Sequence, residues 1–163
     1  MKLELKKIKT CKFASEETTC FQAQLWYEDI HLANVSNAGK GGCDDIDPLP
    51  GRGGQTFRNI IEMIEAHMKA KPPVVHYGVT LPYSLELWVA DQVARDTDLQ
   101  RFKRRLKKFM TFLSAGRVLS VKRVDPEKDI AWLRLNYPHA TVLDTPEKIV
   151  DALEKLEPRN VRE

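Results

Sequence analysis

The chain has 163 residues, of which 42% are hydrophobic and 30% charged, a balance typical of a globular protein rather than a disordered one. Its formal net charge of +3 is too small to identify a partner. No apolar run approaches the roughly 18–20 residues of a membrane-spanning helix, and residues 1–10 lack the apolar core of a signal peptide. We therefore expect one domain over residues 1–163, in the cytoplasm and not bound to a membrane.

The first 36 residues predict a three-stranded antiparallel meander. Polar and apolar residues alternate over 2–13 and 20–27, with the short polar connector ASEETT between them. A tight turn then leads to a third strand over 30–36, although glycine is absent from that turn.

The register of the first hairpin follows from its apolar residues. Pairing Thr10 with Phe21 and Leu5 with Leu25 puts the two apolar faces on the same side of the sheet. This pairing requires a bulge near Lys6 and Lys7, where the alternation changes parity.

The cysteines favour a reducing compartment. Cys11, Cys20 and Cys43 are odd in number and form no C-x-x-C pair, so the spacing matches no familiar zinc motif. The hairpin register places Cys11 opposite Cys20, where a reducing cytoplasm would keep both as thiols.

A glycine-rich segment follows the third strand, and we expect a long loop over 37–47. It is not a phosphate-binding loop of the Walker type, because Val35 replaces the first glycine and Gly41 replaces the serine or threonine after Lys40. A milder hypothesis is an anion-binding nest of successive backbone amides beside the Lys40 charge. The alternative is a wide connection with glycines where φ is positive. The candidate residues of this loop are Asn37, Gly39, Lys40, Gly41, Gly42, Cys43, Asp44 and Asp45.

Three aspartates of this loop raise the question of a hard cation. Asp44, Asp45 and Asp47 supply oxygen ligands, but their spacing is not that of an EF-hand. We expect no metal and no cofactor, and interpret them as solvated turn residues.

The middle of the chain predicts helices. Apolar residues recur every three or four positions from Phe57 to Met68, and Pro72 and Pro73 end this helix. Residues 74–82 are expected to be extended. Ser84 is a cap for a helix to about Arg95, and Thr97 with Gln100 forms a capping-box pattern that begins another helix or restarts the same one.

The C-terminal third predicts a hairpin and a strand–helix unit. Residues 110–124 form two strands around a glycine turn, and Asp125–Pro126 begins a helix. Residues 140–144 form a short buried strand, and Thr145–Pro146 begins the last helix. Strands and helices do not alternate strictly, so the predicted class is α+β.

The strongest charge signal lies in residues 101–123, which contain nine Lys or Arg and no Asp or Glu, against 17 basic and 23 acidic residues elsewhere. Such a segment is typical of nucleic-acid binding. The alternatives are an acidic protein surface as partner, or a solvated helix face. Phe109 and Phe112 fit the core better than a base-stacking platform. The candidate contacts are Arg101, Arg104, Arg105 and Lys108.

Catalysis has weak support. The four histidines form no metal-ligand spacing, and Cys43 with His76 is a nucleophile–base pair without any flanking signature. The position of Ser15–Glu17 at a hairpin tip is sufficient to explain their polarity, and the alternative is that the tip shares one surface with the glycine-rich loop.

Four stretches of the sequence resemble a family of uncharacterised proteins from phages and prophage regions. They are FASEETTCFQAQLWYEDI, NAGKGGCDDIDP, FMTFLSAGRVLSVK and VLDTPEKIVDAL. The resemblance implies an origin in a mobile element and no particular activity. Together, these features favour a non-enzymatic accessory protein that binds nucleic acid or a host protein through the loop 37–47 and the basic segment 101–123. The rival prediction is a small enzyme that holds a nucleotide-like or phosphorylated ligand at the glycine-rich loop.

Overall fold

The computed structural model describes residues 2–51, 57–76 and 78–156. Both strands and helices are present, in three antiparallel sheets, so the predicted α+β class is confirmed. The chain divides into two units, residues 1–94 and residues 95–163. Helix α2, Leu85–Leu106, contributes to both of them. The single domain stays a prediction, since two units that share a helix can unfold together or separately.

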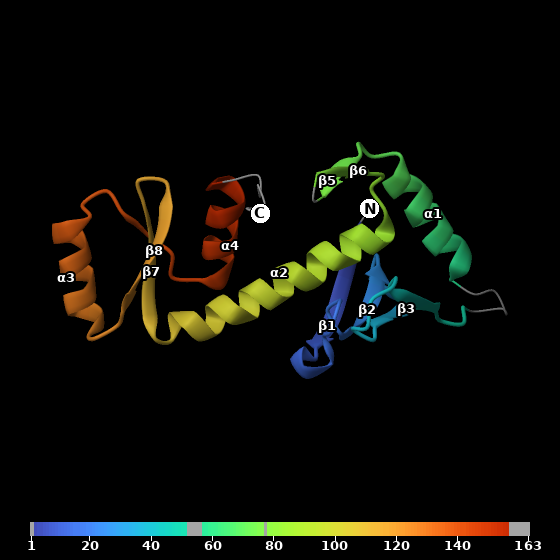
Figure 1. Cartoon of the computed structure of the whole chain (residues 1–163), viewed down its shortest axis with the longest axis horizontal. Helices are drawn as coiled ribbons and strands as arrows, with labels where there is room; N and C mark the ends of the chain where they lie inside the picture. Colours follow the sequence, from blue (N-terminus) through green and yellow to red (C-terminus); the bar gives the residue numbers. More distant parts are fainter. Residues whose placement is uncertain (1, 52–56, 77, 157–163) are drawn as a thin grey trace. The chain divides into compact units, whose positions relative to one another are not determined.

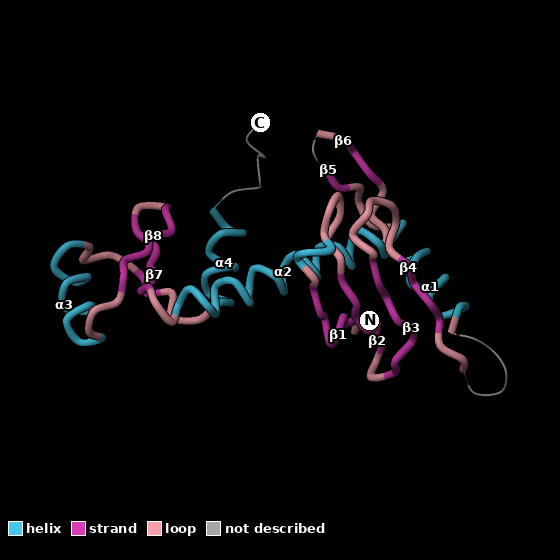
Figure 2. Tube along the Cα trace, turned by 60° about the horizontal axis from the view of Figure 1, so that its bottom comes forward, coloured by secondary structure: helices cyan, strands magenta, loops and turns pink. Residues whose placement is uncertain are grey.

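The first unit is built on a four-stranded antiparallel sheet in the order β1-β2-β3-β4, whose strands run side by side in Figure 2. Its strands are β1 Leu3–Thr10, β2 Phe21–Tyr27, β3 Ile30–Asn37 and β4 Asp45–Pro48. The predicted three-stranded meander is confirmed, but the predicted 37–47 loop is too long. Its last residues form β4, in which Ile46 pairs with Val35. A short edge strand tolerates the aspartates and the proline that concealed it in the sequence.

The predicted register of the first hairpin is confirmed. Thr10 pairs with Phe21 and Leu5 with Leu25, and the register shifts between Lys6 and Lys9. Lys7 has a φ of 54°, in the left-handed region, so it absorbs the extra residue of the bulge. After the bulge, the apolar side chains of β1 therefore point to the same face of the sheet as they do before it.

The turn between β2 and β3 needs no glycine. Glu28 and Asp29 have φ values of 45° and 68°, the positive pair that a two-residue hairpin turn with matching twist requires. Lys2 contacts the Asp29 carboxylate at 3.4 Å, which places a countercharge beside this strained turn.

Helices α1, Arg58–Lys69, and the first half of α2 cover the inner face of this sheet. The core that they share is wholly apolar and includes Leu25, Leu32, Val35, Ile61, Ile64, Met68, Leu85, Val89 and Val93. The Ser84 hydroxyl accepts a hydrogen bond from the Leu87 amide at 3.1 Å, so the predicted cap of α2 is confirmed.

Two details of this region differ from the sequence prediction. Residues 74–82 form a small hairpin, β5 Val74–His76 and β6 Val79–Leu81, rather than one extended segment. Gly78, with a φ of 76°, permits the reversal. Helix α2 also runs through Thr97 without a break, so the capping-box prediction is wrong there. Gln100 donates to Asp96 instead of reaching back to Thr97.

The second unit is a three-stranded antiparallel sheet in the order β8-β7-β9, with helices on both faces. After α2 come β7 Phe109–Ser114, β8 Arg117–Lys122, α3 Pro126–Asn136, β9 Thr141–Val142 and α4 Pro146–Leu156. Figure 1 shows β7 and β8 between α3 and α4.

Strand parity divides the core of the second unit into two clusters. Met110 and Phe112 of β7 pack against Leu133 of α3, whereas Leu113 and Val118 pack on the side of Ile149 in α4. The predicted hairpin and helices of this unit are present. The predicted strand over 140–144 is present as the two residues of β9, but it is not buried: Thr141 is exposed and Val142 half-buried, and the buried residue is Leu143, which follows the strand.

The last two helices begin where the sequence predicts, and each has a side-chain cap. The Asp125 carboxylate accepts from the Glu127 and Lys128 amides, and the Thr145 hydroxyl accepts from the Lys148 amide at 3.3 Å.

Candidate nucleic-acid interface

The basic segment occupies the last turns of α2 and the strands that follow. On the helix, Phe102 and Leu106 are buried at 5% and 9% exposure and fix which side faces the core. The positions between them point outward, because buried residues spaced four apart define one stripe of a helix. Cations at the C-terminal end of a helix also interact favourably with its dipole, by about 0.3–1 kcal/mol each.

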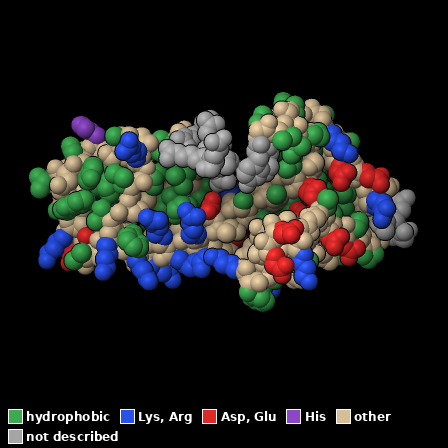
Figure 3. Space-filling view, viewed as in Figure 1, with side chains coloured by type: hydrophobic (Ala, Val, Ile, Leu, Met, Phe, Trp, Pro, Cys, Tyr) green, Lys and Arg blue, Asp and Glu red, His purple; other side chains and the backbone are tan. Residues whose placement is uncertain are grey.

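All nine cations of residues 101–123 are exposed. Figure 3 shows Lys and Arg side chains gathered along one edge of the second unit. Arg101 lies 3.7 Å from the Asp98 carboxylate. Among the described residues, no salt bridge holds the other eight, which are Lys103, Arg104, Arg105, Lys107, Lys108, Arg117, Lys122 and Arg123.

The fold brings Lys122 and Arg123 next to Lys108, which follows the C-terminal end of α2. The Arg123 amide donates to the Lys108 carbonyl at 2.9 Å, and Lys122 pairs with Phe109 across β7 and β8. Arg117 is the exception, because it pairs with Ser114 beside the hairpin turn, at the other end of the strands. We define the basic cluster as Arg101, Lys103, Arg104, Arg105, Lys107, Lys108, Lys122 and Arg123.

Two arginines of the basic cluster lie over aromatic rings. The Arg101 and Arg105 guanidinium carbons are 5.0 and 5.5 Å from the ring centroids of Phe102 and Phe109. Phe112 is 1% exposed, which confirms that it belongs to the core and not to a base-stacking platform.

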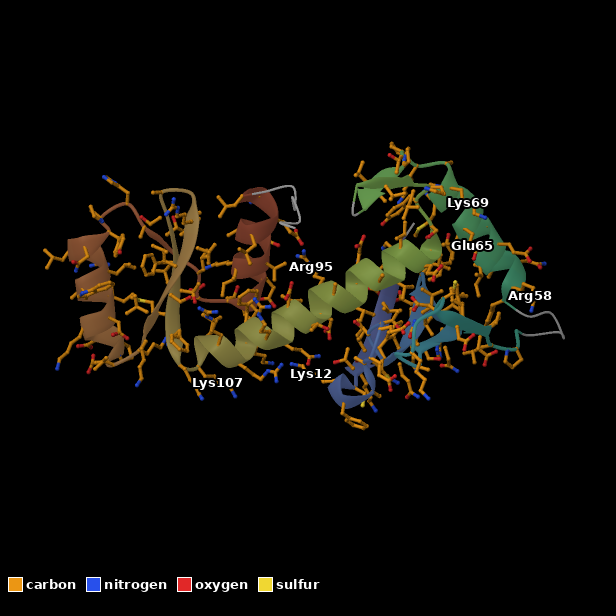
Figure 4. The ribbon with its side chains drawn as sticks, in the orientation of Figure 1. Lys12, Arg58, Glu65, Lys69, Arg95 and Lys107 are labelled. Atoms are coloured by element: carbon orange, nitrogen blue, oxygen red, sulfur yellow. The ribbon has the colours of Figure 1, made fainter. Side chains whose placement is uncertain are left out.

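Arg95 shows how a cation of the same helix behaves when it is paired. Its guanidinium donates to Asp151 at 2.9 Å and also to Glu154, both on α4. These hydrogen bonds raise the pKa of Arg95. Figure 4 labels Arg95 near α4 and Lys107 at the far end of α2. One end of this helix segment therefore holds α4, while the other presents its charges to solvent.

The glycine-rich loop is organised around one buried amide. Asn37 is 9% exposed, and its Oδ1 accepts from the Thr18 hydroxyl at 2.7 Å and from the Gly39 amide at 2.8 Å. Its Nδ2 donates to the Asp44 carboxylate at 2.9 Å and to the Gly42 carbonyl at 3.3 Å. This side chain therefore ties the β1–β2 tip, the loop and the start of β4 together.

The hairpin tip packs onto the same loop, which favours the alternative in which the two form one surface. The Gly39 carbonyl accepts from the Glu16 and Glu17 amides at 2.8 and 3.0 Å. A Cβ on Gly39 would lie 2.0 Å from the Ala14 carbonyl oxygen, so only glycine fits there.

The anion-nest hypothesis loses two of its donors in this arrangement. The Gly39 amide donates to Asn37 and the Gly41 amide to the Thr18 hydroxyl, at 2.8 and 3.3 Å. Lys40 is exposed at the surface of the loop. The amides thus build the loop itself, which favours the interpretation of a structured connection.

The loop aspartates have different environments. Asp45 and Asp47 point outward from β4, while Asp44 is half-buried. Burial raises the pKa of Asp44, and the hydrogen bond from Asn37 opposes this increase. Across the described ranges, no group of three His, Cys, Asp or Glu side chains is placed to hold a metal ion.

Cys43 has an acidic neighbour. Glu86, in the first turn of α2, raises the pKa of the Cys43 thiol by its charge and by a hydrogen bond, and it accepts from the Asp44 amide at 3.2 Å. A raised pKa makes a thiol less nucleophilic at neutral pH. The side chain of His76, the other member of the predicted pair, lies outside the described residues.

The glycine-rich loop belongs to the first unit and the basic segment to the second. Cys11 and Cys20 are neighbours across the hairpin, with the Cys11 amide 2.9 Å from the Cys20 carbonyl oxygen, and both are free thiols together with Cys43.

The outer face of the four-stranded sheet carries a groove that was not predicted from the sequence. The groove measures about 390 Å³ and is lined by Lys7, Lys9, Gln22, Ala23, Gln24, Asn34, Val35 and Ser36. One sequence signal could have indicated this groove. Gln22 and Gln24 are two residues apart on β2 and therefore point to the same face of the sheet, and the register places Ser36 and Asn34 opposite them.

Comparison with known proteins adds no family, because no family model, curated protein or solved structure matches this chain. Among the described residues, no helix combines the length and the apolar character needed to cross a membrane.

Proposed function

We propose that this protein binds nucleic acid and that the basic cluster of the second unit is its main contact with phosphate. The observation that carries the proposal is the set of exposed cations around the junction of α2, β7 and β8, most of which have no carboxylate partner among the described residues. Residues 95–163 contain 16 Lys or Arg and 11 Asp or Glu, against 10 and 12 in residues 1–94, so the charge asymmetry follows the division into units.

A solvated helix face accounts less well for this arrangement. Surface charges that only keep a protein in solution are usually interspersed in sign, as at Lys148 and Asp144, which lie 2.6 Å apart. By contrast, residues 101–123 contain nine Lys or Arg and no Asp or Glu. Such a patch concentrates polyanions, because each phosphate contact releases condensed counterions.

The proposal describes a binding protein without catalysis, in a reducing cytoplasm that suits three free thiols. The enzyme alternative is less favoured, since the Gly39 and Gly41 amides are already used inside the loop and Glu86 weakens the Cys43 nucleophile. A host protein with an acidic surface is the remaining alternative for the basic cluster.

Fluorescence anisotropy with a labelled 20-base-pair duplex tests the proposal. The test variant is Arg104→Ala/Arg105→Ala/Lys108→Ala. The control is Lys128→Ala/Lys148→Ala/Lys155→Ala, which removes the same charge from other exposed positions of the second unit. If Arg104, Arg105 and Lys108 each contact one phosphate, the affinity of the test variant for the duplex is about 500-fold lower than that of the wild type at 0.1 M salt. Equal affinities for the two variants would overturn the proposal.

A further inference from the structure

The outer face of the four-stranded sheet has no assigned role. Helices α1 and α2 pack on the inner face, while the outer face presents polar side chains in cross-strand rows. One row is Lys9, Gln22, Ser36 and Asp45, and the next is Lys6, Gln24, Asn34 and Asp47. The rows are basic at the β1 edge, uncharged in the middle and acidic at the β4 edge.

The groove on this face lies on the basic side. Its lining comes from β1, β2 and β3 and includes two ammonium groups, three carboxamides and one hydroxyl, but no carboxylate. Lys7 and Lys9 are exposed, and within the described ranges neither makes a salt bridge. At the β1 edge the nearby Lys6 behaves differently, because it pairs with Glu4 at 3.0 Å and lies 4.4 Å above the Trp26 ring.

We propose that this groove binds a single strand of nucleic acid, with Lys7 and Lys9 on its phosphates and the exposed carboxamides of Gln22 and Asn34 on base edges and sugar oxygens. The charge of the lining is complementary to a phosphate backbone, and the aspartates of β4 confine the strand to the β1–β3 side. Carboxamides donate and accept together, as the edges of bases require. Those edges are fully accessible only when the bases are unpaired.

This inference rests on the proposed nucleic-acid function and assigns it a second, strand-selective surface. A positively charged groove that follows the backbone is the usual device for single strands. The stacked Trp26 and His31 rings, 5.1 Å apart, also lie on β2 and β3. Because the Trp26 and His31 rings already stack on each other, we do not assign them to base stacking. The proposal depends on the contacts of lysines with phosphates and of side-chain amides with bases and sugars.

The test compares two variants of the full chain, each lacking two charges. Lys7→Gln/Lys9→Gln removes the groove cations, and Lys12→Gln/Lys69→Gln removes lysines of the same unit that do not line the groove; the latter pair is labelled in Figure 4. The probes are a labelled 15-nucleotide oligo(dT) and a 15-base-pair duplex. For two phosphate contacts, oligo(dT) affinity falls about 25-fold at 0.1 M salt, and the slope of log affinity against log salt falls by about 1.4. The control stays within about twofold of the wild type.

A second measurement guards against a folding defect in the groove variant. In wild-type protein, oligo(dT) shifts the side-chain NH₂ resonances of Gln22 and Asn34, and Gln22→Ala/Asn34→Ala weakens binding without changing the salt slope. Any of three results would overturn the inference. The groove variant loses the same affinity for oligo(dT) as for the duplex, it binds oligo(dT) as tightly as the wild type does, or oligo(dT) leaves the side-chain NH₂ resonances unshifted.

The outcomes separate this inference from the proposed function. If only the basic-cluster variant loses affinity, for both probes, the proposed function stands and the groove has no part in it. If only the groove variant loses oligo(dT) affinity, the groove stands and the basic cluster is not the main contact. A wild-type protein that binds neither probe contradicts both.

Discussion

Replacing Asn37 by alanine tests whether one buried amide organises the glycine-rich loop. The change removes four hydrogen bonds, to Thr18, Gly39, Gly42 and Asp44, from a residue that is 9% exposed. A buried amide left without an acceptor costs about 1–3 kcal/mol, and bonds to charged groups contribute about 1.5–3 kcal/mol. The orphaned Gly39 amide and the lost Asp44 bond therefore predict a loss of about 2.5–6 kcal/mol in unfolding free energy.

The assay is urea unfolding followed by circular dichroism, with Asn34→Ala as the matched control. Asn34 lies on the same strand and is exposed, so its replacement is expected to change stability by less than about 0.5 kcal/mol. An Asn37→Ala variant that unfolds at the same urea concentration as Asn34→Ala would refute the reasoning.

Three further predictions concern the same loop. Gly39→Ala is expected to cost more than about 2 kcal/mol, because its Cβ would meet the Ala14 carbonyl oxygen at 2.0 Å; unfolding midpoints like those of the wild type would contradict this. Asp44→Asn removes a carboxylate whose pKa is raised by burial. The wild type is therefore expected to lose stability relative to the variant as the pH rises from below 3.8 through the pKa of Asp44 in the folded protein. Stability curves of the two proteins that run parallel between pH 3 and pH 7 would argue against this. Glu86→Gln lowers the pKa of Cys43 and speeds its alkylation by iodoacetamide at pH 8, measured by peptide mass spectrometry; an unchanged rate would show that Glu86 does not control the thiol.

Much of the fold could be predicted from local patterns. The bulge at Lys6 and Lys7, the pairing of Leu5 with Leu25 and the Ser84 cap follow from alternation, parity and capping preference, and all three are present. What sequence patterns missed depends on distant partners. Strand β4 is two aspartates around Ile46, and its strand character comes from the neighbouring β3.

The candidate sites were predicted only in part, for the same reason. The density of Lys and Arg in residues 101–123 identified the basic cluster, and the exposure of those residues agrees with it. The role of Asn37 was not predictable, because it depends on the conformation of the loop, which places Gly39, Gly42 and Asp44 around one side chain, and on Thr18 of the β1–β2 connector. The outer groove was missed because Gln22 and Asn34 become neighbours only when β2 and β3 pair.

The salt dependence of duplex binding tests the central claim most directly. Each contact between a cation and a duplex phosphate contributes about 0.9 to the slope of log affinity against log salt. If Arg104, Arg105 and Lys108 each contact a phosphate, the triple alanine variant has a slope about 2.7 smaller than that of the wild type. The account would be contradicted if the affinity of the wild type for the duplex did not change with salt concentration, or if the triple variant had the same slope as the wild type.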